Sequence, residues 1–333
     1  MKTTFLTSTF IFLLINITNA QTKITIDTAL KNEVIDKVAE IMREKYVFED
    51  VGIKMADHIR KLHRQGKYDS FSEIKPFCSQ MTKDLREISH DKHLFVFHSP
   101  EERKEVAARN NLLPAKEIQR IEEAQEKADR KGSYGFNKVE ILDRNIGYID
   151  LNWFSGSPKA EEKVIETMKF LSDTEAIIID LRDNGGGGGT AGNLLMSYFF
   201  DKKVPFTGAY SRETGKITKS WSLDEVPGKK RPDVDLYILI SKRTFSAAED
   251  FSYTLQALDR ATIVGEPSKG GAHPVDVIIV KGDILTQVSI GNSVNPLTGS
   301  NWEGTGVIPD IRIDAVNALE TALNLALDKL TIK

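Results

Sequence analysis

The stretches IIIDLRDNGGGGGT (residues 177–190) and VDLYILISKRTFSAAEDF (residues 234–251) decide the fold. In each, a short apolar run ends in a turn, and a helical pattern begins directly after it. Such runs, rich in isoleucine and leucine and bounded by turn residues, are typical of buried strands. The two stretches therefore predict strands that lead into helices, as in a mixed α/β core.

The segments around these two stretches repeat the alternation of strand and helix. Period-2 or apolar runs predict strands at 138–142, 145–151, 176–181, 235–240, 262–265, 275–280 and 285–290. Helical spacing predicts helices at 159–171, 191–200, 247–258 and 315–330. Residues 134–333 are thus expected to form the α/β core, with no internal repeat.

The residues before the core have a different character. Apolar residues recur at helical spacing over 27–64 and 71–88, and a short apolar run at 94–97 favours a strand. We therefore predict an N-terminal helical domain over residues 21–98. Residues 99–133 are dense in Glu, Lys and Arg, which predicts a charged linker of solvated helices or a lid.

The first twenty residues follow the order charged, apolar, small that is typical of a secretory signal peptide. The apolar run is short for a membrane span, so we expect cleavage after Ala20 and an exported protein, periplasmic or extracellular. An uncleaved anchor is the alternative. No later segment is long and apolar enough to be an integral membrane span.

Composition narrows the function classes. The chain has 333 residues, 40% of them hydrophobic, which is enough for a substantial core and about two domains. A net charge of -3 argues against nucleic-acid binding. Cys78 is the one cysteine, so the chain cannot form an internal disulfide, and we expect a small buried hydrophobic residue there.

Ser246 lies where the second apolar run turns into a helix. A serine at a helix start, beside glycine-rich backbone amides, suits acyl transfer, since those amides can meet the charge that develops on a carbonyl oxygen. The sequence therefore points to a serine hydrolase. The structural alternative is a capping box, in which Ser246 begins the helix and Glu249 reaches back to it. One serine can fill both roles, and the small Ala247 leaves it accessible.

A serine hydroxyl needs a base, usually histidine, because it is a weak nucleophile near neutral pH. Of six histidines, His90 and His93 precede the apolar run at 94–97, and His273 lies in a glycine loop. His90 and His93 could instead be a metal pair, with Asp84 or Asp91 as a third ligand. That site would be incomplete, so we expect no metal.

The glycine run at 185–189 resembles a dinucleotide-binding turn at first sight. Its spacing fits poorly, because Thr190 replaces the third glycine, and the chain has no P-loop lysine motif. Glycine here more plausibly lets the backbone approach a substrate carbonyl and offer an amide, although an ordinary flexible turn is the simpler alternative.

Four ordered motifs resemble the tail-specific, or C-terminal processing, serine peptidase family. They are DLRDNGGG (180–187), FSAAE (245–249), VGEP with GGA (264–272) and EGTGVIPD (303–310). The branch resembled includes tricorn protease cores and interphotoreceptor retinoid-binding protein modules. The resemblance implies a crotonase/Clp-like mixed α/β core, with Ser246 as its nucleophile.

The resemblance also implies the partners of that serine. Processing peptidases place a lysine base in the loop after Gly-Glu-Pro, but Gly271 occupies that position here and Lys269 is two residues out of register. The tricorn-like branch uses a histidine before the core and a glutamate, which match His93 and Glu303, with His90 as a reserve base. Lys92 beside His93 is a departure, because its charge lowers proton affinity.

By the same resemblance, amides of Gly186, Gly187 and Ala247 would form the oxyanion hole. The implied function is an exported serine peptidase that hydrolyses peptide or protein substrates without a metal or organic cofactor. The alternative is a catalytically silent protein that binds apolar ligands or peptides on the same fold. The stretch from Leu94 to Tyr134 is too short to hold the PDZ module that is usual in processing peptidases. The sequence leaves the oligomeric state open.

Overall fold

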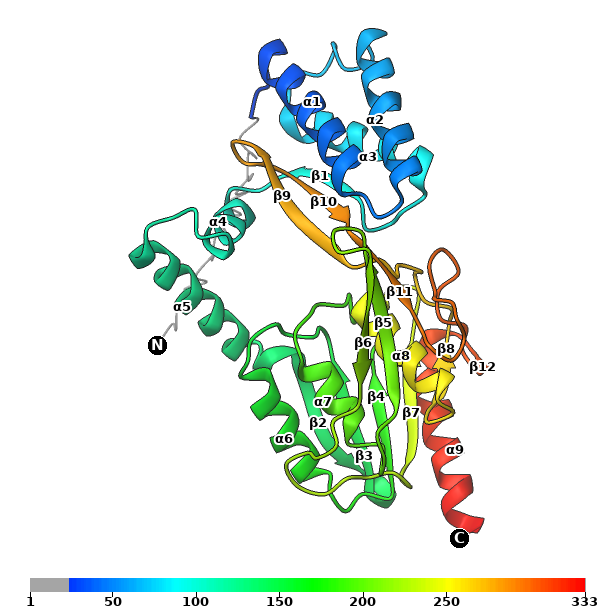
Figure 1. Cartoon of the computed structure of the whole chain (residues 1–333). Coiled ribbons are helices and arrows are strands. Elements are labelled where there is room, and N and C mark those ends of the chain that lie inside the picture. The colour runs from blue at the N-terminus through cyan, green and yellow to red at the C-terminus, as the bar shows by residue number, and fades with distance from the viewer. Residues whose placement is uncertain (1–23, 333) are drawn as a thin grey trace, which may run out of the picture.

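The computed structural model describes residues 24–332, and its centre is a six-stranded sheet in the order β12-β8-β7-β4-β3-β2 (Figure 1). The predicted signal peptide lies outside the described residues. The strands are β2 (Phe136–Leu142), β3 (Ile146–Leu151), β4 (Ala176–Asp180), β7 (Asp235–Ile240), β8 (Thr262–Gly265) and β12 (Ile311–Arg312). All neighbours are parallel except β2, which runs antiparallel to β3. The predicted mixed α/β class is confirmed.

Helices cover both faces of this sheet. One face packs with α6 (Ala160–Phe170), α7 (Ala191–Ser197) and α8 (Ala247–Ala257), and the other packs with α9 (Ala318–Ile332). Within β4, Ile177 and Ile179 face the first group, whereas Ala176 and Ile178 face α9. A strand buried on both faces reads as a continuous apolar run, which explains why the sequence pattern located it.

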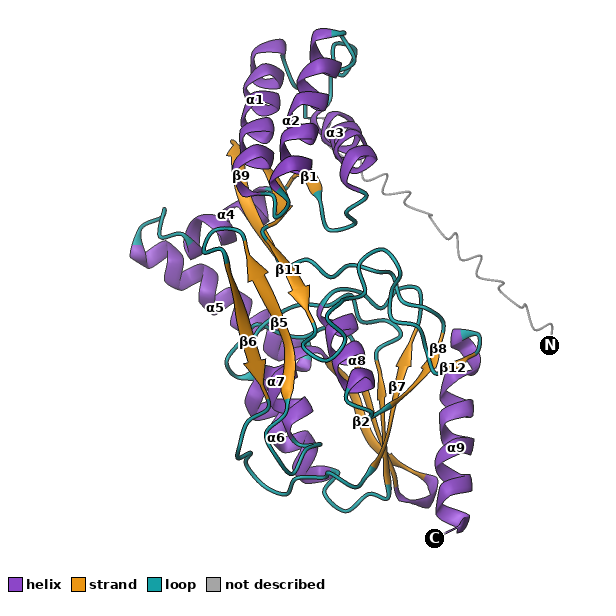
Figure 2. Cartoon of the chain, turned by 45° about the vertical axis from the view of Figure 1, so that its right-hand side comes forward, coloured by secondary structure: helices purple, strands orange, loops and turns teal. Residues whose placement is uncertain are grey.

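The predicted N-terminal helices form a second core. They are α1 (Thr28–Lys45), α2 (Glu49–Arg64) and α3 (Ile74–Ser89), and they pack on an antiparallel sheet of β1 (Phe95–His98), β10 (Ile284–Ser289) and β9 (Val275–Lys281). The β9–β10 hairpin therefore leaves the segment assigned to the core and completes the N-terminal unit (Figure 2). The boundaries at 98/99 and 133/134 stay predictions.

A third sheet joins the two units. It consists of β11 (Gly291–Val294), β5 (Pro205–Ser211) and β6 (Lys216–Trp221), which the sequence pattern did not predict. Arg212, directly after β5, donates to the backbone carbonyls of Tyr46 at 2.5 Å and Arg43 at 2.9 Å. These hydrogen bonds tie the sheet to the end of α1.

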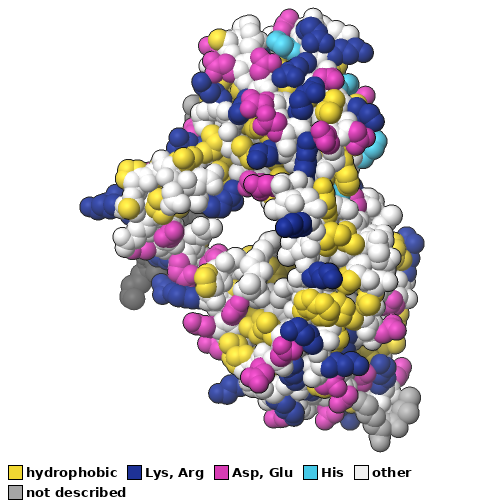
Figure 3. All heavy atoms as spheres, in the orientation of Figure 1, with side chains coloured by type: hydrophobic (Ala, Val, Ile, Leu, Met, Phe, Trp, Pro, Cys, Tyr) yellow, Lys and Arg dark blue, Asp and Glu magenta, His cyan; other side chains and the backbone are white. Residues whose placement is uncertain are grey.

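The charged segment before residue 134 forms two helices, α4 (Pro100–Arg109) and α5 (Ala115–Lys131). None of the side chains of α5 is buried, and the space-filling view shows an opening between the arm on the left and the rest of the molecule (Figure 3). Short 3-10 turns lie at Ser133–Gly135, Asp143–Asn145 and Ala315–Asn317. Across the described residues, no helix combines the length and apolar character that a membrane span needs.

Cys78 lies inside the core of the N-terminal unit. Its side chain is buried, and burial raises the pKa of its thiol to about 12. A thiol with such a pKa stays protonated near neutral pH and is a poor nucleophile. The structure therefore agrees with a small buried hydrophobic residue at this position.

Candidate active site

Ser246 lies in the sharp turn between β7 and α8. Its backbone has φ 57° and ψ −121°, and its side chain is half-buried. A positive φ is uncommon for any residue but glycine and is strained, so surrounding contacts must hold it. Strained strand-to-helix turns of this kind present a nucleophile at the end of a sheet. The hydroxyl is not sealed in the apolar core.

Glu249 supplies much of what holds this turn. Its fully buried carboxylate accepts hydrogen bonds from the Ser246 N–H at 2.8 Å, the Ser268 hydroxyl at 2.5 Å, the Gly270 N–H at 2.6 Å and the Gly271 N–H at 2.9 Å. Burial raises the pKa of Glu249, while the four donors oppose the rise. The predicted reach of Glu249 back to Ser246 is confirmed, and the same carboxylate also fixes the loop at 268–271.

Asn184 fixes the glycine run against the nucleophile. Its side-chain amide donates to the carbonyl of Leu151 at 2.8 Å, and its side-chain oxygen accepts the Gly186 N–H at 2.8 Å. Its own carbonyl accepts the Phe245 N–H at 3.1 Å. One buried residue thus connects the end of β3, the glycine run and the residue before Ser246. Sequence reasoning assigned Asn184 no role of its own.

The glycine run approaches Ser246 closely. A Cβ added at Gly186 would lie 2.8 Å from the Ser246 Cβ, and the backbone there has φ +103°. The Gly186 N–H is already used by Asn184. Within residues 24–332, the N–H groups of Gly187 and Ala247 have no such internal acceptor. Of the three predicted oxyanion donors, these two are available to a ligand.

His93 lies beside this turn with its backbone held on both sides. Its N–H donates to Asp91 at 2.8 Å, and its carbonyl accepts from Gln287 at 2.6 Å. Its ring packs on the ring of Phe245, with 4.4 Å between centroids. The predicted base is therefore brought next to the residue that precedes the predicted nucleophile.

The imidazole of His93 is buried, and neither ring nitrogen has a hydrogen-bond partner among the described residues. The hydrogen bond between Ser246 and His93 is thus not formed in this structure. Burial lowers the pKa of His93 to about 4; the Asp91 carboxylate opposes this effect, and His273 and Lys269 add to it. A buried imidazole with free nitrogens and a low pKa is neutral at pH 7 and can accept a proton.

Lys92 and His90, the neighbours of this base, point elsewhere. The Lys92 ammonium donates to the carbonyl of Lys269, so its charge is directed to that loop. His90 is exposed, ends α3 and has φ 55°. Because α3 ends before it, His90 and His93 do not share a helical face, and the structure does not support a metal pair.

Glu303 lies against His273 rather than His93. The Nδ1 atom of His273 is 3.7 Å from Glu303 and 3.4 Å from Asp91, and the Ala272 N–H donates to Glu303 at 2.6 Å. Ser289 donates to Asp91 at 2.6 Å. Sequence reasoning considered His273 and Asp91 separately but did not predict that they meet Glu303.

The side chains of Asp91, His273 and Glu303 shift one another's pKa values. Burial favours neutral His273, but its hydrogen bond to Asp91 and the two nearby carboxylates outweigh burial and raise its pKa. Burial disfavours the charged carboxylate of Asp91, yet hydrogen bonds from His273 and Ser289 stabilise it and lower its pKa. Burial raises the pKa of Glu303, and His273 partly opposes that rise.

Asp91, His273 and Glu303 are also the described side chains close enough to share a metal ion, with ligand atoms within 4.8 Å of one another.

Gly271 lies where the processing peptidases that the sequence resembles place a lysine. A Cβ there would overlap the ring of Phe245 and lie 2.7 Å from the Cε1 atom of His93. Lys269 instead places its ammonium over the Phe245 ring, 4.3 Å from the centroid. Phe245 and His93 thus fill the space that a side chain at 271 would enter first.

We expect Gly271→Ala to lower activity strongly, because the added methyl group must displace Phe245 or His93. The loss in kcat/KM should be on the order of 100-fold, as misplacement of a catalytic group by about 1 Å produces. Gly185→Ala is the matched control, since its Cβ would meet nothing within 4 Å. Equal kcat/KM of the two variants would show that His93 takes no part in catalysis.

A small pocket of about 60 Å³ opens beside Ala247. Its lining is mixed: Phe154, Met196, Ala247 and Phe251 contribute apolar side chains, whereas Asn193 and Asp250 are polar. Burial raises the pKa of Asp250 to about 6. The pocket thus adjoins the free amide that follows Ser246.

Comparison with known proteins gives a family. Residues 145–313, just over half of the chain, match the model of peptidase family S41, and residues 17–129 match the N-terminal domain of Peptidase_S41 in eukaryotic IRBP. Carboxyl-terminal-processing peptidase 1, chloroplastic, of Arabidopsis thaliana is 31% identical over 184 residues, covering 54% of this chain and 36% of that protein. A probable CtpA-like serine protease of Staphylococcus aureus (strain COL) is 24% identical over 212 residues, which cover 63% of this chain and 42% of that protein. The chain thus spans less than half the length of these curated relatives.

Solved structures show the same fold. A putative peptidase from Parabacteroides merdae has a TM-score of 0.61 at 18% identity, covering 89% of this chain and 96% of that one. The tricorn protease has a TM-score of 0.55 at 12% identity, covering 90% of this chain and 37% of that one. The strained serine beside a glycine run, together with the match over residues 145–313, shows that the chain belongs to peptidase family S41, whose named relatives include serine proteases.

Proposed function

We propose that the protein is an exported serine peptidase that hydrolyses peptide bonds with Ser246 as nucleophile. The observation that carries the proposal is the turn itself: Ser246 is held at a positive φ, half-exposed, next to the free N–H of Ala247 and against Gly186, which the free N–H of Gly187 directly follows. Two amides placed in this way can stabilise the oxyanion of a tetrahedral intermediate. Export rests on the sequence of residues 1–20.

In this proposal His93 takes the proton of Ser246 and later delivers it to the leaving amine. Its position against Phe245 and its two unpartnered ring nitrogens support that role. The serine–histidine hydrogen bond would then form on substrate binding, as catalytic hydrogen bonds often do. His90 is too exposed to compete, since it caps α3 in open solvent.

In this proposal Glu303 acts on His93 indirectly, through its contacts with Ala272 and His273. It holds the loop at 272–273 by the Ala272 N–H and balances the charge of His273. The carboxylate that favours a proton on His93 is that of Asp91. The acid assigned by resemblance thus stays in the proposal, with His273 as its direct contact.

Hydrolysis of an unstructured peptide by the purified protein tests the proposal. Mass spectrometry should identify two fragments whose masses sum to the peptide plus one water, and His93→Ala should reduce their formation. His98→Ala is the control, because His98 lies in β1 outside the site. No fragments, together with saturable binding of an apolar ligand, would favour the binding protein instead.

The pH dependence of hydrolysis should follow His93. Protonation removes the base, and its pKa is lowered to about 4, so kcat/KM should stay high at pH 5 to 6 and fall only as the pH approaches about 4. The measurement is kcat/KM from about pH 3 to pH 8, with the fluorescence of buried Trp302 as a check that the protein stays folded. An acidic limb near the ordinary histidine value of 6.5 would contradict this assignment.

A further inference from the structure

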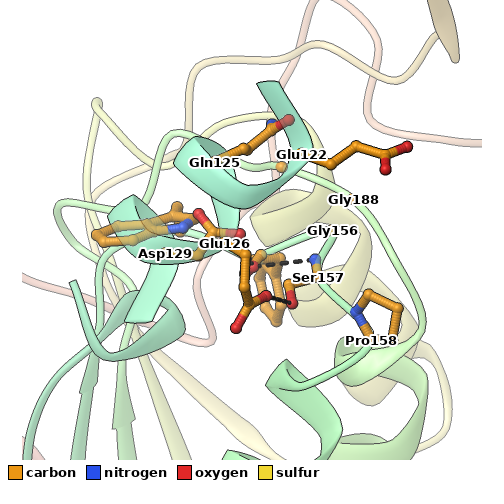
Figure 4. A pocket seen from close by; sticks show the side chains of 12 residues that line it. Glu122, Gln125, Glu126, Asp129, Gly156, Ser157, Pro158 and Gly188 are labelled. Atoms are coloured by element: carbon orange, nitrogen blue, oxygen red, sulfur yellow. Dashed lines mark hydrogen bonds between the residues drawn. The ribbon is translucent and has the colours of Figure 1, made fainter. Parts of the chain in front are cut away.

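A second, much larger pocket adjoins the glycine run. Its volume is about 690 Å³, and α5 forms one wall while the loop at 153–158 and the backbone of Gly187 and Gly188 form the other. Figure 4 shows Glu122, Gln125 and Glu126 on α5, with the loop of Gly156 and Pro158 facing them. Asp129 completes the acidic side of this pocket, which we call the α5 pocket.

The α5 pocket reaches the candidate active site through the backbone. Gly187, one of its lining residues, directly follows Gly186, whose added Cβ would lie 2.8 Å from the Ser246 Cβ. Phe154 and Gly188 line both the α5 pocket and the small pocket beside Ala247. A peptide whose reacting carbonyl sits at Gly187 and Ala247 therefore places one nearby side chain toward α5.

The charge of the α5 pocket is negative. Glu126 pairs with Lys159 at 3.2 Å, whereas Glu122 and Asp129 have no ion pair with any described lysine or arginine. Three carboxylates and one ammonium thus meet here. Within a partly enclosed pocket such an excess attracts cations and repels anions more strongly than in open water.

Two of the carboxylates are held in place. Glu126 accepts hydrogen bonds from the hydroxyls of Ser157 at 2.7 Å and Tyr134 at 2.8 Å, and these bonds lower its pKa. Asp129 accepts from the Ser155 hydroxyl at 2.8 Å. Glu122 is exposed and projects from α5 into the pocket (Figure 4). Two of the three acids are therefore fixed around a space of about 690 Å³.

We propose that the α5 pocket binds a lysine or arginine side chain of an unfolded peptide substrate close to the bond that is cleaved, so that α5 sets the charge preference of the enzyme. The inference rests on the proposed peptidase function and deepens it. A long cationic side chain suits a pocket of this size, while aspartate or glutamate at the same position of the peptide would face like charge.

A peptide series tests the proposal with the full chain. One unstructured peptide of alanine and serine carries Arg, Gln or Glu at a single position, and that position is scanned along the sequence. We expect kcat/KM to be about tenfold higher for Arg than for Glu at one or two adjacent positions, and the ratio to shrink in 0.5 M salt. Equal values at every position would overturn the inference.

Charge reversal on α5 gives the matched comparison. Glu122→Lys should reduce the Arg-to-Glu ratio about tenfold, because it converts an attractive contact into a repulsive one. Glu123→Lys changes the net charge equally on the same helix but does not line the pocket, so it should change the ratio less than about twofold. Equal effects of both variants would mean that net charge, and not the pocket, sets the preference.

Binding separates this inference from the proposed function. Fluorescence anisotropy with Ser246→Ala protein measures affinity for the Arg and Glu peptides without turnover. Preferential binding of the Arg peptide supports the α5 pocket even if the parent protein cleaves nothing, which would refute only the peptidase proposal. Cleavage without any charge preference refutes only the α5 pocket.

Discussion

Ser246→Ala should abolish peptide hydrolysis, with a loss in kcat/KM of about 10⁴-fold or more. The serine hydroxyl forms the bond to the substrate carbonyl in the proposed reaction, and alanine offers no nucleophile. Folding should be preserved, because the positive φ is held by backbone contacts and by Glu249, which accepts the N–H of residue 246 whatever its side chain. The measurement is kcat/KM for an unstructured peptide, with thermal unfolding in parallel.

Ser300→Ala is the control for this result. Ser300 is exposed in the turn-rich segment after β11, so its substitution should leave kcat/KM unchanged. Residual hydrolysis by Ser246→Ala within tenfold of the parent would remove Ser246 from the mechanism. Unfolding of Ser246→Ala would instead show that the serine hydroxyl stabilises the turn.

Glu249→Ala should lower both stability and activity. Its carboxylate accepts four buried hydrogen bonds, and without it the Gly270 and Gly271 N–H groups lose their acceptor inside the protein. Leaving buried donors unpaired costs about 1–3 kcal/mol each, so the free energy of unfolding should fall by about 3 kcal/mol or more. Because the same bonds fix Ser246, kcat/KM should fall with it. Urea unfolding and peptide hydrolysis measure the two effects.

Glu320→Ala provides a matched control for Glu249→Ala. Glu320 also stands at the third position of its helix, α9, but its side chain is exposed. Its substitution should change the free energy of unfolding by less than about 0.5 kcal/mol. Similar losses in both variants would mean that the acid acts on the helix end alone and not on the loop at 268–271.

Local pattern predicted the central sheet well, and the reason is burial. The segments 177–179 and 236–240 are apolar throughout because helices cover both faces of β4 and β7. Ser246 followed from the same pattern, since the end of β7 and the start of α8 enclose it. Predictions of this kind depend on neighbours in the sequence, which a single chain displays directly.

Contacts between distant segments were beyond such reasoning. Asp91, His273 and Glu303 meet although they come from three segments far apart in the sequence, which lie before β1, before β9 and after β11. The signal in the sequence was weak, namely a histidine in a glycine loop. Strands β5 and β6 were missed as well, because most of β6 is exposed and lacks a clear apolar pattern.

The resemblance to a peptidase family identified partners that pattern could not. It selected His93 among six histidines, and the structure places the ring of His93 on Phe245, next to Ser246. It also selected Gly186 as an oxyanion donor, whereas the amide of Gly186 is engaged by Asn184. Family motifs indicate which residues gather at a site, and only coordinates show which of their atoms are free.

Labelling with a fluorophosphonate tests the central claim most directly. Such a probe reacts with a serine hydroxyl that a neighbouring base activates, and it needs no knowledge of the natural substrate. We expect mass spectrometry to find the adduct on Ser246 of the parent protein, with labelling greatly reduced in His93→Ala. A parent protein that stays unlabelled while folded, or that carries the adduct on another residue, would contradict the account.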